Sequence, residues 1–278
     1  MGSREVGVKN WIVTSLVFLA IVVTASAQSL YVPASANADG AAGTQWHTDL
    51  QVKAGGGESA TVSVELLKVG ENNSSPLSAD FNIAPGQSMR LRDVVADVFG
   101  FSGTGALRVT ATDGTILVTS RTFNDDPEGT YGQYVPAISD DDATPFGSTA
   151  SLLQLSRSPN TSEGFRTNIG FVNVTGEPIN VEVDLFDADG SPFGTVERRL
   201  KRYGYWQLND VFASVNATDV ADGYAMARTI SEGGSFITYA SIVDNRSGDA
   251  IFIPGQVDDP PVEEQEKLIV FEILTRDT

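Results

Sequence analysis

The sequence contains no cysteine and a single histidine, and these two shortages exclude several kinds of site. A chain without cysteine forms no disulfide and offers no thiolate to a metal. One imidazole is too few for the usual zinc or copper ligand sets. That histidine, His47, lies on the polar side of an expected strand, so we expect a surface residue. No Ser–His–Asp or Cys–His catalytic arrangement is predicted.

Positive charge is scarce as well. Lysine and arginine number 18 against 36 aspartate and glutamate residues, and the net charge is −18. Such a surface repels nucleic acid and anionic lipid headgroups. We therefore expect a neutral or cationic partner, a protein or a glycan, and no nucleic acid.

Long apolar runs are rare, and the clearest one lies at the N-terminus. Residues 11–24 are mostly apolar, Arg4 and Lys9 precede them, and the small residues 25–27 follow. This order is typical of a secretory signal peptide, which we predict over residues 1–27. The alternative is an uncleaved anchor, but the run is shorter than the ~20 residues that a membrane-spanning helix needs. We expect a secreted, periplasmic or cell-surface protein with no membrane span after cleavage.

What the chain does contain is an internal repeat. The segment 105–136 recurs in altered form at 223–254, and residues 46–50 (WHTDL) correspond to residues 165–169 (FRTNI). The spacing of about 118 residues is the size of a whole domain. The pattern therefore predicts a duplicated domain rather than an array of short repeats.

The repeat unit has the pattern of β-strands with one buried face. Apolar residues alternate with polar ones, for example across residues 62–66 and 179–185. Asp113-Gly114, between two such segments, predicts a β-hairpin. The sequence thus predicts an all-β protein with two tandem immunoglobulin-like antiparallel β-sandwich domains, residues 28–144 and 145–256.

Each domain is also expected to contain one short helix. Apolar residues at helical spacing occupy residues 91–99 and again residues 208–215. Asp93 and Asp210 stand at equivalent places near the two helix starts, and we expect their carboxylates to cap free N–H groups there.

Residues 257–278 follow the second domain as an acidic linker and a C-terminal strand. The linker contains Pro260-Pro261, and residues 267–274 (KLIVFEIL) form an apolar segment that has no counterpart after the first domain. Two arrangements are open: the strand folds back onto the second domain, or it pairs with another molecule by strand addition.

Two sets of residues are candidates for binding. Asn124-Asp125 and Asp244-Asn245 recur at equivalent strand ends, where Asx turns are the simpler explanation and a shared Ca²⁺ site is the alternative. Apart from this calcium no cofactor is expected. Aromatic residues that cluster locally could stack on a sugar or anchor a protein, or could fill the core: Tyr131, Tyr134, Tyr203, Tyr205 and Trp206.

Four stretches carry a resemblance: WHTDL at 46–50, GALRVT at 105–110, VTSRTFN at 118–124 and GTYGQYVP at 129–136. With them the chain resembles uncharacterised secreted bacterial proteins built from a tandem β-sandwich module. The resemblance covers most of the mature chain and implies bacterial export and a β-sandwich fold. It implies no activity and no site residues.

The expected function is that of an exported, non-catalytic binding or structural module, not an enzyme. One alternative is a carbohydrate-binding protein. A second is a subunit of an extracellular assembly that uses the C-terminal strand to join its neighbour.

Overall fold

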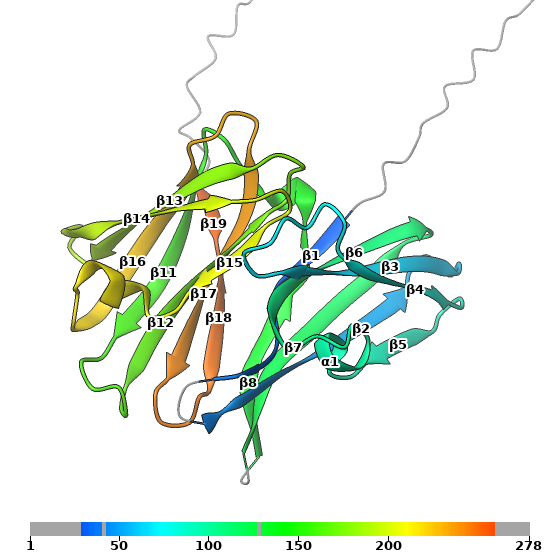
Figure 1. Cartoon of the computed structure of the whole chain (residues 1–278), viewed down its shortest axis with the longest axis horizontal. Coiled ribbons are helices and arrows are strands. Elements are labelled where there is room, and N and C mark those ends of the chain that lie inside the picture. The colour runs from blue at the N-terminus through cyan, green and yellow to red at the C-terminus, as the bar shows by residue number, and fades with distance from the viewer. Residues whose placement is uncertain (1–28, 41–42, 127–128, 259–278) are drawn as a thin grey trace, which may run out of the picture.

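The computed structural model describes residues 29–40, 43–126 and 129–258. The predicted signal peptide and the predicted C-terminal strand lie outside these residues, as does nearly all of the predicted linker. The protein is all-β, with 64% of residues in strands and 6% in helices, and its sheets are antiparallel (Figure 1). We describe it as an N-terminal half, residues 29–143, and a C-terminal half, residues 144–258.

The N-terminal half holds one nine-stranded sheet that forms two layers. Strand β1 (Ser29–Asp39) belongs to both, because it pairs with β6 (Gly103–Asp113) and, at its end, with β2 (Gln45–Ala54). The other elements are β3 (Ala60–Lys68), β4 (Leu77–Ile83), β5 (Ser88–Leu91), α1 (Val94–Asp97), β7 (Ile116–Asp126), β8 (Gly129–Pro136), β9 (Ile138–Ser139) and η2 (Asp140–Asp142). One layer runs β4–β3–β6–β1–β9, and the other places β5 and β7 beside β2 and β8 beside β7.

The C-terminal half repeats this pairing in two five-stranded sheets, β14–β13–β16–β11–β19 and β10–β17–β12–β15 with β18 on β17. Its elements are β10 (Thr144–Pro145), β11 (Thr149–Arg157), β12 (Phe165–Asn173), β13 (Ile179–Asp187), β14 (Pro192–Leu200), β15 (Tyr205–Leu208), η3 (Val211–Val215), β16 (Val220–Thr229), β17 (Ser235–Asp244), β18 (Ala250–Pro254) and β19 (Gln256–Asp258). The register repeats too: Leu50 lies opposite Leu91 as Ile169 lies opposite Leu208.

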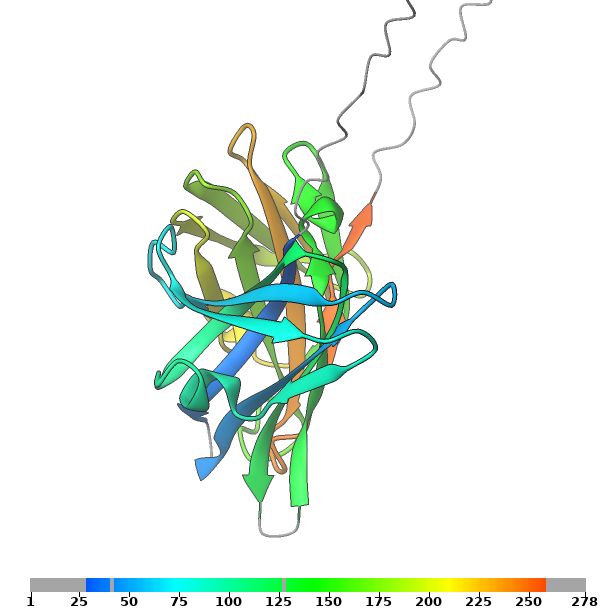
Figure 2. The same cartoon turned by 90° about the vertical axis from the view of Figure 1, so that its right-hand side faces the viewer.

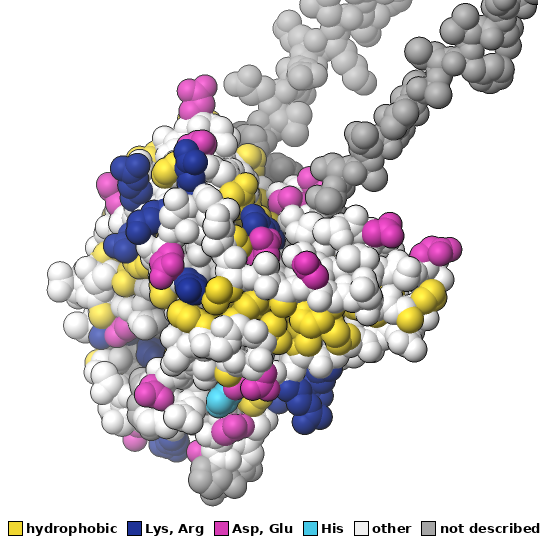
Figure 3. All heavy atoms as spheres, turned by 45° about the vertical axis from the view of Figure 1, so that its right-hand side comes forward, with side chains coloured by type: hydrophobic (Ala, Val, Ile, Leu, Met, Phe, Trp, Pro, Cys, Tyr) yellow, Lys and Arg dark blue, Asp and Glu magenta, His cyan; other side chains and the backbone are white. Residues whose placement is uncertain are grey.

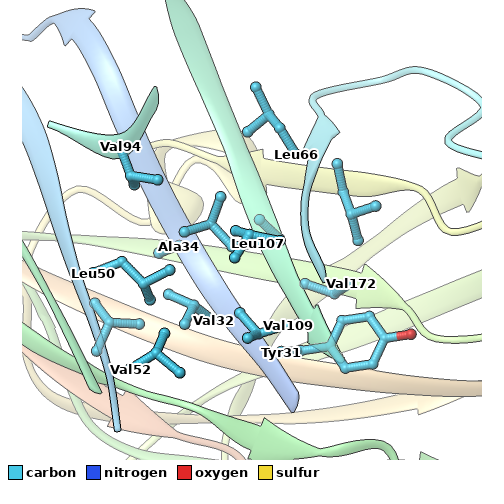
Figure 4. Packing of buried hydrophobic residues seen from close by; sticks show 14 of the residues in the cluster. Tyr31, Val32, Ala34, Leu50, Val52, Leu66, Val94, Leu107, Val109 and Val172 are labelled. Atoms are coloured by element: carbon cyan, nitrogen blue, oxygen red, sulfur yellow. The ribbon is translucent and has the colours of Figure 1, made fainter. Parts of the chain in front are cut away.

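Alternating side chains of the strands build an apolar core between the layers of each half. Figure 4 shows Leu50 and Val52 of β2 gathered with Val32 of β1 and Val109 of β6. Val172 of β12 reaches the same cluster from the C-terminal half. The core of the N-terminal half therefore continues across the junction between the halves.

The junction explains why β12 and β17 are buried on both faces. One face places Ile169 and Phe171 in the core of the C-terminal half. The opposite face carries Val172, Ile237 and Tyr239, which pack against the N-terminal half. Further along the junction, the segment after β3 meets the chain before and within β15, where the backbone N–H groups of residues 70 and 73 donate to the carbonyls of residues 205 and 202.

Each half has a short helical element where one was predicted, but α1 and the 3-10 helix η3 are shorter than the predicted residues 91–99 and 208–215. The reason is that Leu91 and Leu208 are held in the strand ladders of β5 and β15. The predicted capping is wrong. The predicted N-cap residues Asp93 and Asp210 have left-handed backbones, φ 38° and 48°, and neither side chain makes a capping hydrogen bond. Both carboxylates are held instead by basic side chains.

The predicted hairpin at Asp113-Gly114 is also wrong. The turn joins β6 to β7, but β6 pairs with β1 and β3, whereas β7 pairs with β2 and β8. The chain here crosses from one layer to the other. Asp189-Gly190, by contrast, joins the directly paired strands β13 and β14 and is a hairpin turn.

Candidate functional site

A cleft opens where the two halves meet. The outer face of β12 and β17 is apolar toward one end, where Val172 and Tyr239 are sealed against the N-terminal half. Toward the other end it is polar, and Arg166, Asn168 and Ser241 line a cavity of about 340 Å³. We call this cavity the central cleft.

Both halves build the central cleft. The N-terminal half contributes residues 34–36 and 38–40 of and after β1, Trp46 of β2 and Gln133 of β8. The C-terminal half adds Gln207 and Asn209 beside the face of β12. Because each strand is fixed in a ladder, these side chains are positioned without a ligand.

Two amide side chains in the cleft keep hydrogen-bond donors available. Asn168 is 8% exposed, and its Oδ1 accepts the backbone N–H of Asp210 at 3.0 Å. Gln133 is 7% exposed, and its Oε1 accepts the hydroxyl of Ser241 at 3.1 Å. Within the described residues neither NH₂ group donates a hydrogen bond. Among the described residues Oδ1 of Asp93 is the one enclosed side-chain polar atom without a hydrogen bond, so both NH₂ groups reach the solvent of the cleft. They are therefore available to a ligand or to water.

Arg166 adds a positive charge to the cleft. Its Nη1 donates to Oδ1 of Asn245 at 2.9 Å, and no carboxylate of the described chain lies within salt-bridge distance of it. Burial lowers the pKa of the guanidinium below its usual value, and the charges of Asp210 and Asp244 partly oppose this shift. A half-buried cation without a directly bonded anion attracts electronegative ligand atoms.

The predicted aromatic candidates do not come together. Tyr205 is 1% exposed and forms part of the cleft wall, whereas Tyr134 is 61% exposed on β8 and lies outside the cleft. Tyr131 and Tyr203 are partly buried, and Arg108 covers the ring of Tyr203. Trp206 packs against the C-terminal core. Core or junction packing thus accounts for most of the set.

The aromatic side chain that does line the cleft beside its polar groups is Trp46. Its indole lies near Gly40, where an added Cβ would collide with the ring. Sequence reasoning placed Trp46 at the head of a strand and did not single it out for binding. The signal that could have found it is its position in the repeat, where the equivalent residue, Phe165, is 42% exposed.

The calcium candidates are used largely for structural hydrogen bonds. Asn124 is 1% exposed, and its Nδ2 donates to the carbonyl of Gly248 across the junction. Asp244 accepts two backbone N–H groups in an Asx turn, and Nδ2 of Asn245 donates to two backbone carbonyls. Asp125 remains exposed. In the described part of the chain, no three His, Asp or Glu side chains are grouped to hold a metal.

His47 is not the free surface residue that we expected. Its Nδ1 lies 2.7 Å from Oδ2 of Asp93, and its Nε2 lies 3.9 Å from Asp125. Asp49 accepts the backbone N–H of Asp93 at 3.0 Å and so holds this carboxylate in place. The partial cover of His47, whose side chain is 23% exposed, follows from the left-handed turn at Asp93, which directs the carboxylate back over β2.

The C-terminal half repeats this network with a permanent cation. Arg166 occupies the place of His47, Asp210 that of Asp93, and Asn245 that of Asp125. Asn168 accepts the backbone N–H of Asp210 just as Asp49 accepts that of Asp93. Arg157 supplies the direct ion pair to Asp210 at 2.8 Å. Each half therefore places a cationic or ionisable nitrogen at this strand end.

Substitution of His47 tests the network. His47→Arg imitates the C-terminal half and is expected to change the free energy of unfolding by less than about 0.5 kcal/mol. His47→Ala leaves the Asp93 carboxylate without its partner and is expected to cost about 1–2 kcal/mol. Urea unfolding at neutral pH measures both. Equal losses in the two variants would contradict a role for the nitrogen–carboxylate contact.

No helix among the described residues is both long enough and apolar enough to cross a bilayer. Comparison with protein-family models, with curated proteins and with solved structures finds no match. The functional argument therefore depends on the geometry of this chain alone.

Proposed function

We propose that the protein is an exported, non-catalytic binding protein made of two duplicated immunoglobulin-like sandwich domains, and that it holds its ligand in the central cleft. The single observation that carries the proposal is the pair of inward-facing amide NH₂ groups of Asn168 and Gln133. Both residues are more than nine-tenths buried, and both line a cavity rather than packed core. The junction between two domains is also a common place for a ligand site.

The ligand class that we favour is a small carbohydrate. The cleft presents donors from Asn168, Gln133 and Arg166 and an acceptor carboxylate from Asp39, which together match the hydroxyl groups of a sugar, because each hydroxyl both accepts and donates. Trp46 adds an apolar ring against which a sugar can stack. A volume of about 340 Å³ falls at the small end of the range for ligand pockets, as a monosaccharide or disaccharide requires.

The test is a saccharide screen on the chain from Gln28 to Thr278, read first as a rise in melting temperature and then as a Kd. Ala38→Trp narrows the cleft without removing a polar contact, because Ala38 is a partly buried lining residue. We expect it to weaken binding about tenfold or more. A bound sugar stabilises the folded state by mass action, so the wild type should melt higher in its presence.

Ala96→Trp is the matched control, since Ala96 is also partly buried but lies on α1, outside the cleft. It should bind as the wild type does. A saccharide that binds Ala38→Trp and the wild type equally well would place the ligand elsewhere. Failure of every saccharide to bind would remove the carbohydrate class.

A further inference from the structure

The described part of the N-terminal half has two strand edges that are not paired. The two layers end in β4 and β5, and within the described residues β4 pairs only with β3 and β5 only with β2. These free edges lie on the side away from the C-terminal half (Figure 1). Figure 2 looks onto that side, with the cyan hairpin β3–β4 toward the viewer. We call the surface between the edges of β4 and β5 the edge seam.

The edge seam is apolar. Phe81 of β4 and Met89 of β5 belong to the rim of the core and are only partly buried, as are Leu91, Phe99 and Phe101. Figure 3 shows a continuous hydrophobic band on this face of the molecule. An apolar band beside two unpaired strand edges offers both backbone hydrogen bonds and a buried surface to an added strand.

The C-terminal half covers the equivalent surface. Arg198 stands where the N-terminal half has Phe81, and Trp206 stands where it has Met89. The guanidinium of Arg198 lies over the Trp206 ring, 5.0 Å from its centre. In addition η3 packs against β14, whereas α1 packs against β1 and β2. In the C-terminal half a charged side chain thus covers the apolar ring at this position, and among its described residues the N-terminal half has no equivalent charged side chain.

The chain carries a segment that suits this surface. Residues 267–274 (KLIVFEIL) are mostly apolar and rich in β-forming side chains, and this segment of 8 residues is one residue longer than β4, which has 7. The described chain ends in β19 within the C-terminal half, whereas β4 and β5 lie on the side of the N-terminal half that faces away from it (Figure 1). That separation favours a second copy of the chain as the source of the segment.

We propose that residues 267–274 of one copy add as a strand to the free edge of β4 in a second copy and cover its edge seam. The contact is head-to-tail, so repetition produces chains of subunits rather than closed dimers. This assembly function does not involve the central cleft, so its test and the test of sugar binding are independent.

The test is the mass in solution of the chain from Gln28 to Thr278, measured by light scattering over a range of concentrations. We expect oligomers that grow with concentration. Phe81→Arg, which installs the residue of the C-terminal half, should yield monomers, and so should Phe271→Asp. Addition of a synthetic peptide of residues 267–274 in excess should dissociate the wild-type oligomers.

Leu117→Arg is the control, because Leu117 is 64% exposed on β7 and lies outside the seam. It should assemble as the wild type does, and circular dichroism checks that each variant is folded. A monomeric wild type would overturn the proposal, including the case in which the segment docks within its own chain. Oligomers that persist in folded Phe271→Asp would overturn it as well.

Discussion

Tyr239→Ala is expected to lower the free energy of unfolding by about 3–5 kcal/mol, the range for removal of a buried aromatic ring. The ring is fully buried at the junction and stacks on Phe252 with 5.2 Å between ring centres. It lies over Gly170, where a Cβ would collide with it. Its hydroxyl donates to Gln207 at 2.6 Å and lies 3.0 Å from that of Tyr205. The substitution therefore removes packing and leaves buried polar atoms unpaired.

The measurement is urea unfolding followed by tryptophan fluorescence and by circular dichroism. In the wild type the shared core predicts one transition, and in Tyr239→Ala we expect the halves to separate into two. Tyr134→Ala is the control, because its ring is 61% exposed, and it should cost less than about 0.5 kcal/mol. A loss below about 1 kcal/mol in Tyr239→Ala would show that the junction contributes little to stability.

Alkaline pH is expected to destabilise the protein strongly, through its buried tyrosines. Burial raises the pKa of Tyr31 and of Tyr205 from 10.0 to about 12, partly opposed by Arg108 and by Tyr239 respectively. Burial also raises the pKa of Tyr239 well above its usual value. Because the folded state holds these phenols neutral, their contribution is complete below pH 10 and is lost as the pH rises from 10 toward 12. Ionisation at each of Tyr31 and Tyr205 then lowers the free energy of unfolding by roughly 2–3 kcal/mol.

Melting temperature measured in steps from pH 9 to pH 12 checks this expectation, with absorbance of the phenolate as a second readout. The informative quantity is the difference in this decline between variants. Tyr31→Phe should flatten the decline, because phenylalanine has no proton to lose. Tyr134→Phe, at an exposed position, should leave the decline unchanged. A decline that is equally steep in Tyr31→Phe and in the wild type would contradict the assignment.

Much of the fold could be predicted from local patterns. The alternation at residues 62–66 became β3, with Val62, Val64 and Leu66 all buried, because the period of two in a strand directs alternate side chains to one face. The repeat at residues 46–50 and 165–169 became β2 and β12, which hold the same place in the pairing order. Both patterns are local or directly visible on comparison of the two segments.

The candidate site could not be predicted in the same way. Asn168 and Gln133 are unremarkable strand residues in the sequence, and only the docking of the two halves turns their amides toward one cavity. His47 was predicted to face water because it alternates with apolar neighbours, yet the chain returns at Asp93 and covers it. Each of these side chains is defined by a partner that lies far away in the sequence.

The sequence by itself determined an acidic, cysteine-free, all-β chain whose segments 105–136 and 223–254 resemble each other, because composition, period and repetition need no partner to be visible. Only the tertiary structure decided that Asp113-Gly114 crosses between layers, since a turn of that composition serves either connection. The tertiary structure alone also decided where the central cleft opens and which seam is left uncovered. The physical reason is that burial and pairing of an outward-facing side chain depend on the surface that packs against it, and that surface comes from another part of the chain.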